Sequence, residues 1–399
     1  MMQSTLRYSE LKTNSKPYWF LLTLLLFLMI AGLAAAHYME NEGHRVTGMD
    51  NQIVWGLPHV FALFLIVAAS GALNVASISS VFHKAEYQPL ARLSAVLSIT
   101  LLLGGLMILV LDLGRPERLI VAMTHYNFKS IFAWNIILYN GFVVIVAVYL
   151  WLMMERRMVA YSKPAGLIAF VWRLVLTTGT GSIFGFLIAR DAYDSAILAP
   201  MFIVMSFSFG LALFILVLIA SFKLDQRVLD DEHLNRLRRL LGIFTAAIFY
   251  FVIVFHVTKL YGTQFHGVEY FILVDGGIFT ALFWIGQIAL GNLLPLGLIY
   301  LPALNNRRGS LMLACLLVII GAFAQLYVII IGGQAFPLDI FPGFEVSSSF
   351  YDGVINSYRP SLWEILLGLG GFSASLLMMF LVMRVLPVTP EILAPNRSA

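Results

Sequence analysis

The sequence predicts an all-α, polytopic integral membrane protein with about ten transmembrane helices. Of its 399 residues, 60% are hydrophobic and only 12% are charged, and the mean hydropathy is +0.89. A soluble domain carries about 25% charged residues. A soluble enzyme, a nucleic-acid-binding protein and a disordered chain are therefore excluded. The apolar residues also form long runs rather than the short alternating segments of a membrane β-barrel.

Ten apolar runs approach or exceed the length of about 20 residues that a helix needs to cross the hydrocarbon core. In chain order they are Tyr18–Ala36, Ile53–Val75, Leu93–Leu111, Ile131–Met153, Ala165–Ile188, Ala199–Ser221, Leu240–Tyr261, Phe271–Leu301, Leu311–Ile331 and Leu362–Leu386. The first resembles a signal peptide at Ala34–Ala36, but its polar lead and apolar core are too long, so we expect a retained helix. The eighth is overlong, and we expect Pro295 and Gly297 to kink or end its helix.

Lysine and arginine are distributed unevenly between the connecting segments. With the N-terminus in the cytoplasm, the inner segments hold 17 of these residues and the outer segments hold 6. Cytoplasmic loops of membrane proteins carry the excess of positive charge, so both termini are predicted to be cytoplasmic. The formal net charge of +4 follows from this bias and does not indicate a nucleic-acid partner.

Ionisable side chains near the hydrocarbon are costly, so each is a candidate functional residue. The predicted topology brings polar groups from four helices to the outer leaflet. They are His59 about two turns into the second span, Asp112 and Arg115 after the third, Tyr126, Asn127 and Ser130 before the fourth, and Arg190 and Asp191 after the fifth. Each has a structural alternative: a packed histidine, an Asp112–Arg115 salt bridge or cap, or snorkelling of Arg190 and Asp191.

This combination suits a quinone, which has an apolar tail, two carbonyl oxygens and two protons to exchange. Asp112 is the first candidate for the proton acceptor, provided that Arg115 keeps it ionised, and His59 is the second. A weaker set, His256, Lys259, Asp275 and Glu364, is a candidate proton path. Gln287, Asn292 and Gln325 are more easily explained as hydrogen bonds between helices.

The sequence predicts no metal site, iron–sulfur cluster or haem in this chain. Its single cysteine, Cys315, can neither hold a cluster nor form an internal disulfide. A b-type haem needs two axial histidines at similar depth, and only His59 and His256 could form such a pair.

The stretch Leu111–Pro116 (LDLGRP), followed by Asn127–Ser130 (NFKS) and Trp134, resembles the membrane subunits of the polysulfide reductase (NrfD/PsrC) family. Trp55–Pro58 (WGLP) and Pro360–Glu364 (PSLWE) fit the same family. The resemblance covers nearly the whole chain, and ten spans are typical of the larger branch that includes DsrP and the membrane subunits of some hydrogenases.

This resemblance implies a subunit of a quinone-dependent respiratory oxidoreductase rather than a complete enzyme, in sulfur-compound or hydrogen metabolism. It would exchange electrons between menaquinone or ubiquinone and a periplasmic ferredoxin-like iron–sulfur subunit, joined by further catalytic or cytochrome subunits. The location implied is the bacterial cytoplasmic (inner) membrane, in contact with lipid. Two four-helix bundles, at 53–198 with the quinone site and at 199–334, would be flanked by single helices in the segments 1–52 and 335–399.

The competing hypothesis is a secondary transporter or a proton-conducting membrane subunit. Transporters place broken helices and polar groups near the bilayer midplane, whereas the charged residues here gather near one surface, which favours the quinone interpretation. The long outer loop, roughly Gly332 to Ser361, is rich in aromatic residues and proline. It is either a cap over the helix ends or a docking surface for an outer partner.

The charge distribution gives the first testable prediction. A reporter fused after Arg397 should report a cytoplasmic location, because an even number of spans returns the chain to the side on which it started. A reporter that is active only outside the membrane would contradict the ten-span topology.

The cysteine and histidine content gives the second. A reduced-minus-oxidised spectrum of the purified subunit should show no b-type α-band, because a cytochrome b with two haems needs four axial histidines and the sequence offers one candidate pair. An α-band would identify His59 and His256 as the first residues to test as ligands.

Overall fold

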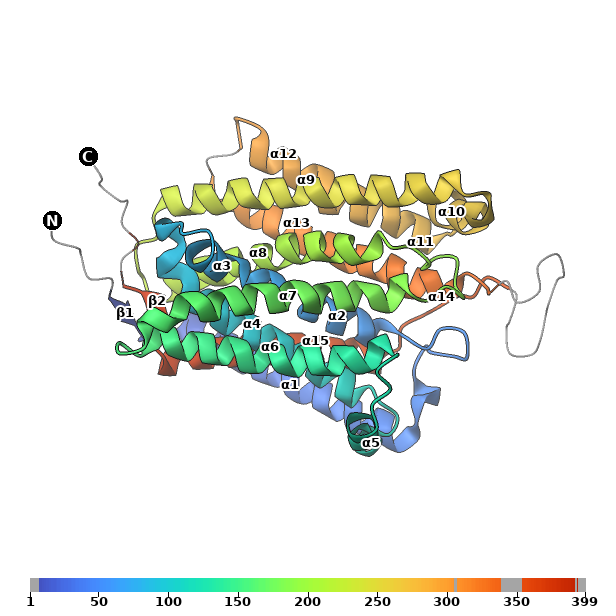
Figure 1. The fold of residues 1–399 in the computed structure, drawn as a ribbon, viewed down its shortest axis with the longest axis horizontal. Helices are drawn as coiled ribbons and strands as arrows, with labels where there is room; N and C mark the ends of the chain where they lie inside the picture. Colours follow the sequence, from blue (N-terminus) through green and yellow to red (C-terminus); the bar gives the residue numbers. More distant parts are fainter. Residues whose placement is uncertain (1–6, 305–306, 339–353, 392, 394–399) are drawn as a thin grey trace.

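The computed structural model describes residues 7–304, 307–338, 354–391 and 393. Residues 339–353, the middle of the long outer loop predicted from the sequence, lie outside the described residues. Within the described part of the chain, ten helices are long and apolar enough to cross a membrane, which confirms the sequence prediction. Figure 1 shows them running side by side along the long axis of the molecule. The protein is therefore an integral, multi-pass, almost entirely helical membrane protein.

The spans and the short elements between them follow one another in a simple order. The spans are α1 (Lys16–Glu42), α2 (Leu57–Ala72) with α3 (Asn74–Ser80), η2 (Ala85–Leu90) with α4 (Ala91–Leu111), α6 (Ile131–Met154), η4 (Val159–Tyr161) with α7 (Ser162–Gly185), α8 (Leu198–Leu224), α9 (Asp231–Tyr261), α11 (Ile278–Ala281) with η7 (Leu282–Leu293) and α12 (Leu294–Tyr300), α13 (Arg308–Tyr327) with η8 (Val328–Gly332) and α14 (Gly333–Ala335), and α15 (Leu362–Val385). The remaining elements are β1 (Tyr8–Ser9), η1 (His44–Val46), η3 (Pro116–Arg118), α5 (Leu119–Thr124), η5 (Thr263–Phe265), α10 (His266–Tyr270), η6 (Phe271–Asp275) and β2 (Thr389–Pro390). Of the η elements, η6, η7 and η8 are π-helical and the others are 3₁₀-helical.

The two ends of the chain meet at one end of the molecule. Strands β1 and β2 pair in antiparallel fashion, with Tyr8 opposite Pro390, and both termini lie at this end, while α5, α10 and α14 lie at the other (Figure 1). An even number of spans requires this arrangement. In the sequence-based topology the end with the termini is the inner end, and the opposite end is the outer end.

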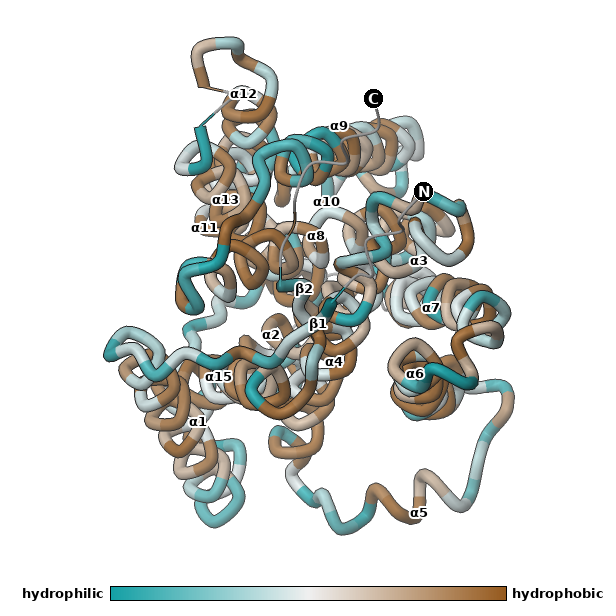
Figure 2. Tube along the Cα trace, turned by 90° about the vertical axis from the view of Figure 1, so that its left-hand side faces the viewer, coloured by the Kyte–Doolittle hydropathy of each residue, from teal (hydrophilic) through white to brown (hydrophobic). Residues whose placement is uncertain are grey.

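Helix α2 is the centre of the packing. Its span is 89% buried, against 28% for α1 at the periphery. It packs on α4 and α8, and α15 packs in turn on α1 and α4; Figure 2 shows α2 and α4 surrounded by the other helices. The α2–α8 contact joins the two predicted bundles.

Small residues allow this close approach. A Cβ atom at Gly71 of α2 would lie 1.5 Å from the carbonyl oxygen of Ser206, and one at Gly210 of α8 would lie 2.2 Å from the backbone nitrogen of Ala72. Lipid supplies no hydrophobic drive between helices, so such backbone contacts carry much of the packing energy. Gly32 and Gly370 make the same kind of contact between α1 and α15.

The expectation for the eighth run was wrong about where the helix is interrupted. The break falls at Gly276 and Gly277, where Gly277 has φ +58°, a conformation that glycine adopts without strain. Pro295 lies in the first turn of α12, directly after the π-helical segment η7, and the helix continues to Tyr300. Because a π-helix already shifts the hydrogen bonds by one residue, a proline at this junction does not end the span.

Replacing Gly210 by alanine should lower the stability of the protein by about 1–3 kcal/mol, the usual cost of overpacking. The added methyl group would collide with the backbone of α2, which cannot move without disturbing the most buried helix. Thermal unfolding followed by size-exclusion chromatography in detergent measures the effect. Gly309→Ala is the control, since a Cβ there meets nothing within 4 Å; equal melting temperatures for the two variants would contradict the packing argument.

Candidate functional site

A buried carboxylate lies between two histidines at the outer end of the first predicted bundle. The Oδ2 atom of Asp112 is 3.0 Å from Nδ1 of His59, and its Oδ1 atom is 3.9 Å from Nε2 of His44. His44 also contacts the backbone carbonyl oxygen of Asp112 at 3.0 Å. The cluster therefore joins the segment after α1, the start of α2 and the end of α4.

Local sequence explains where these side chains lie. Gly56 precedes α2 and Pro58 occupies its first turn, a position that proline favours because its missing N–H needs no partner there. His59 is consequently in the first turn of α2, one turn closer to the outer surface than the sequence indicated. Asp112 caps the C-terminal end of α4, so the two side chains come to the same depth.

The Asp112 carboxylate is almost fully enclosed. Its side chain is 1% exposed, whereas those of His59 and His44 are 22% and 34% exposed. Among the described residues, neither carboxylate oxygen has an aligned hydrogen bond, despite the short distance to His59. A buried carboxylate without aligned donors is costly, so a bound hydrogen-bond donor would stabilise this site.

Trp55 forms an aromatic wall beside His59. The two ring centroids are 6.4 Å apart, and the indole also lies 6.1 Å from the ring of Phe132 on α6 and 5.7 Å from that of Phe184 on α7. The segment before α2 and the outer ends of α6 and α7 thus place flat apolar surfaces next to the imidazole–carboxylate pair.

Arg115 does not pair with Asp112, contrary to the sequence-based expectation. Its side chain is exposed, and the ion pairs of Asp112 within the described residues are those to the two histidines. The chain turns away after α4 because Pro116 begins η3 with Arg115 as its cap. The charge balance of Asp112 is therefore set by imidazole groups.

Tyr126, Asn127 and Ser130 lie in the connection that carries α5, which stands away from the bundle (Figure 2). Tyr126 stacks on Phe128 and lines a cavity of about 370 Å³ with Met123, Ile136, Ile137, Asn140, Gly141, Val144 and Trp172. Asn127 accepts the backbone N–H of Lys129, and Ser130 caps α6. The structure does not bring these three residues into contact with His59.

Arg190 and Asp191 also differ from what was expected of ligand-binding residues. The guanidinium of Arg190 donates to the carbonyl oxygens of Gln334 and Gln52, each at 3.0 Å, and its burial lowers its pKa. The backbone carbonyl of Asp191 accepts a hydrogen bond from Lys259. Both residues hold together the outer ends of helices that are distant in sequence.

The sequence analysis missed Gln334, which organises this region. Its side chain is fully buried, accepts the N–H groups of Val54 and Trp55, and donates to the carbonyl of Trp55. It therefore positions the Trp55 wall from α14, the end of the ninth span. Gln334 follows the ninth apolar run, at the start of the predicted outer loop, where a polar residue is ordinary and gives no signal of a buried role.

A second histidine–carboxylate pair lies in the other bundle. Nδ1 of His256 on α9 is 2.7 Å from Oε2 of Glu269 on α10, and Glu269 is fully buried. The sequence-based candidates did not include Glu269. The eighth apolar run begins at Phe271, so the sequence places Glu269 in the preceding loop. Lys259 lies nearby and donates to Asp191.

Asp275 and Glu364 are not part of this pair. Asp275 is exposed at the end of η6. Glu364 is buried and receives hydrogen bonds from the Tyr358 hydroxyl at 2.5 Å and from the N–H groups of Gly48 and Ser361 at 2.7 Å. Burial raises the pKa of Tyr358, and the hydrogen bond to Glu364 raises it further. Glu364 caps α15 and anchors the segment after α1.

The chain is similar in sequence to membrane subunits of several oxidoreductases. It is 27% identical to the Hdr-like menaquinol oxidoreductase integral membrane subunit of Archaeoglobus fulgidus, over 96% of this chain and 97% of that protein. It is 26% identical to a putative dimethyl sulfoxide reductase membrane subunit of Halobacterium salinarum, over 92% of this chain and 91% of that protein.

A polysulfide reductase chain of Wolinella succinogenes is 26% identical over 72% of this chain and 96% of its own length. Residues 45–338 match the description of one family, polysulphide reductase NrfD. This segment contains the His59–Asp112 pair, the Trp55 wall, Arg190 and the second histidine–carboxylate pair, and the chain belongs to the NrfD family of polysulphide reductase membrane proteins.

Proposed function

We propose that this protein is the quinone-interacting membrane subunit of a respiratory oxidoreductase complex, with its quinone site at the outer end of the first bundle. The observation that carries the proposal is the enclosed Asp112 carboxylate, 3.0 Å from His59 and without an aligned hydrogen bond. The name of the Archaeoglobus relative includes menaquinol, which supports a quinone as the substrate.

The chemistry of quinol oxidation matches these groups. A quinol that gives up two electrons also releases two protons, which nearby bases must accept. Asp112 accepts a proton directly, and His59 accepts one at a ring nitrogen and passes it on, because imidazole is a common general base and proton carrier. The Trp55 ring offers a flat apolar face for the quinone ring.

The electrons must leave through another protein. The one cysteine, Cys315, is buried on α13 and cannot hold an iron–sulfur cluster by itself. We therefore propose that an iron–sulfur subunit docks against the outer end of the molecule and receives the electrons. The names of the relatives, which are membrane subunits of larger oxidoreductases, support an assembly of this kind. The bacterial inner membrane with cytoplasmic termini, and further catalytic or cytochrome subunits, are parts of the same proposal.

The sequence-based candidates differ in the part that we propose for them in quinone binding and proton exchange. We propose Asp112 and His59 as the proton-exchanging pair, with His44 added from the geometry. Tyr126, Asn127 and Ser130 lie on a separate segment, and we propose that the 370 Å³ cavity beside Tyr126 accommodates part of the apolar tail rather than the reacting ring.

Asp112→Asn should lower quinol turnover by the intact complex by about a hundredfold or more, because the amide keeps the shape but cannot accept the proton. Binding should weaken less than turnover, so the loss should appear in kcat more than in KM. Steady-state oxidation of a soluble quinol by the purified complex measures both.

The control is Asp275→Asn, which removes an exposed carboxylate on the predicted outer side. It should turn over quinol at the wild-type rate. If Asp112→Asn and His59→Ala complexes assemble normally and also retain the wild-type rate, the quinone site is elsewhere. Solute or proton flux without quinol turnover would instead support the transporter interpretation.

A further inference from the structure

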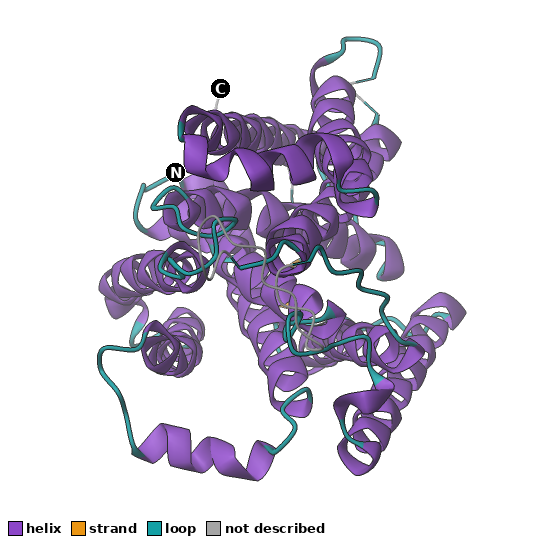
Figure 3. Ribbon diagram, turned by 90° about the vertical axis from the view of Figure 1, so that its right-hand side faces the viewer, coloured by secondary structure: helices purple, strands orange, loops and turns teal. Residues whose placement is uncertain are grey.

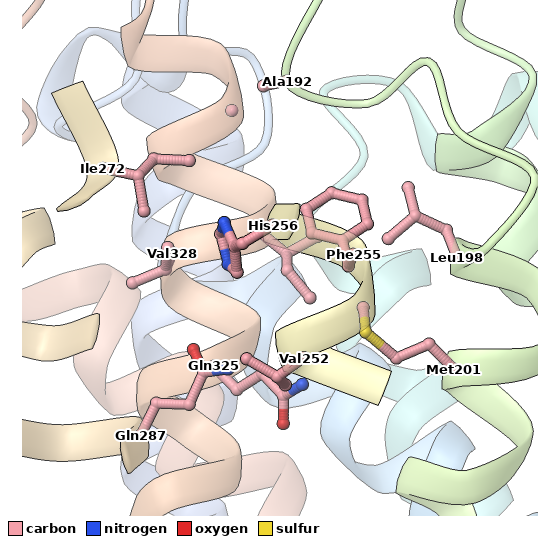
Figure 4. A pocket seen from close by; sticks show the side chains of 12 residues that line it. Ala192, Leu198, Met201, Val252, Phe255, His256, Ile272, Gln287, Gln325 and Val328 are labelled. Carbon is pink, nitrogen blue, oxygen red and sulfur yellow. The ribbon is translucent and has the colours of Figure 1, made fainter. Parts of the chain in front are cut away.

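The second bundle contains an internal cavity beside its histidine–carboxylate pair. Figure 4 shows His256, Gln287 and Gln325 converging on this cavity from different helices. Its volume is about 20 Å³, and a cavity needs roughly 10–15 Å³ to hold one water molecule. The lining is mostly apolar, and the size of the cavity together with the three polar side chains of His256, Gln287 and Gln325 matches a single water.

Several buried polar atoms around the cavity lack partners. Nε2 of Gln325 lines it and has no hydrogen bond within the described residues, and Oε1 of Glu269 is also without one. Because Nδ1 of His256 is occupied by Glu269, the other ring nitrogen is left for a further contact. A buried amide donor without a partner is destabilising, and one bridging water would supply the missing partner.

The backbone around the cavity is π-helical. The lining residues Ile272, Gln287 and Val328 belong to η6, η7 and η8. These are the three π-helical segments of the described chain. A π-helical turn is wider than an α-helical one and is frequent at functional sites. Three such segments meeting at one cavity indicate that the space is built into the fold.

We infer that Glu269, His256 and one buried water form a proton-binding site in the second bundle, distinct from the quinone site. The pair shares one proton between Nδ1 and Oε2. A further proton from the outer aqueous phase adds to Oε1 of Glu269, the oxygen without a partner, and leaves by the same route. The water connects the imidazole to Gln325 and completes the hydrogen bonds in both states.

The surrounding charges determine how readily this proton is taken up. Lys259 lies one turn beyond His256 on α9 and donates to the backbone of Asp191, while the carboxylates of Glu269, Asp194 and Asp191 all act on its charge. The positive charge of Lys259 makes it harder to add a proton to the pair. The negative charges of Asp191 and Asp194 partly offset this effect. Among the described lining residues of the cavity, His256 is the one with an ionisable side chain.

A purely structural role in hydrogen bonding between helices does not explain the same observations. Asn292 already donates to the carbonyl of Gln287 at 2.7 Å, which is a hydrogen bond within one helix. Gln325, by contrast, is left with an unpaired donor facing the cavity. A purely structural ion pair at His256 and Glu269 would need neither the space nor the unpaired amide.

The test is pH-difference infrared spectroscopy of the full-length chain in lipid, with H₂O replaced by D₂O. The wild type should show a protonated carboxylic acid band that shifts in D₂O and disappears in Glu269→Gln. The band should persist in Asp112→Asn and in the control Asp275→Asn. Its absence from the wild type, or its persistence in Glu269→Gln, would overturn the inference.

Gln325→Leu tests the water and does not depend on the folding of the Glu269 variant. Leucine fills the cavity without a polar group, so the carboxylic acid band should shift in frequency. A density map at a resolution that shows waters should contain one water beside His256 in the wild type and none in this variant. An empty cavity in the wild type, or an unshifted band in Gln325→Leu, would contradict the proposed site.

Discussion

The lack of water in the hydrocarbon core is the constraint on which the rest of this structure depends. Every polar group that the chain carries into that region must find a partner within the protein or lose several kcal/mol. The long helices satisfy the backbone, and glycine contacts such as Gly71 with Ser206 bring them close enough to pack. Most of the ionisable side chains then lie near the helix ends, where the structure can partner them, whereas Arg173 is buried in the middle of α7 and donates to the carbonyl of Ser70.

Carbonyl oxygens supply many of these partners at the outer end. Arg190 binds the carbonyls of Gln334 and Gln52, and Lys259 binds that of Asp191. These cations join helix ends without a carboxylate. Among the described residues, three carboxylates are buried: Asp112 and Glu269 lie next to histidines, and Glu364 accepts hydrogen bonds from Tyr358, Gly48 and Ser361. The His59–Asp112 and His256–Glu269 pairs both lie near the outer end, which faces the viewer in Figure 3.

The two pairs differ in what surrounds them, and this decides what each can do. His59 adjoins the Trp55 ring and is partly exposed, which suits a planar molecule that enters from the lipid. His256 adjoins a cavity of about 20 Å³ and a fully buried glutamate, which suits water and a proton. Two histidine–carboxylate pairs thus support two different proposals. The His59–Asp112 pair lies beside an aromatic wall, whereas the His256–Glu269 pair lies beside π-helical turns.

The sequence by itself determined the ten spans and marked His59, Asp112 and His256 as ionisable residues in or beside them, because apolar run length and the cost of intramembrane charge are local properties. It could not determine the partners. Asp112 pairs with His59 and His44 rather than with Arg115, three residues away, and Gln334 positions Trp55 from 279 residues further along the chain. Such contacts depend on how helices pack, and in a membrane the packing follows from small residues and backbone geometry rather than from hydrophobic pattern.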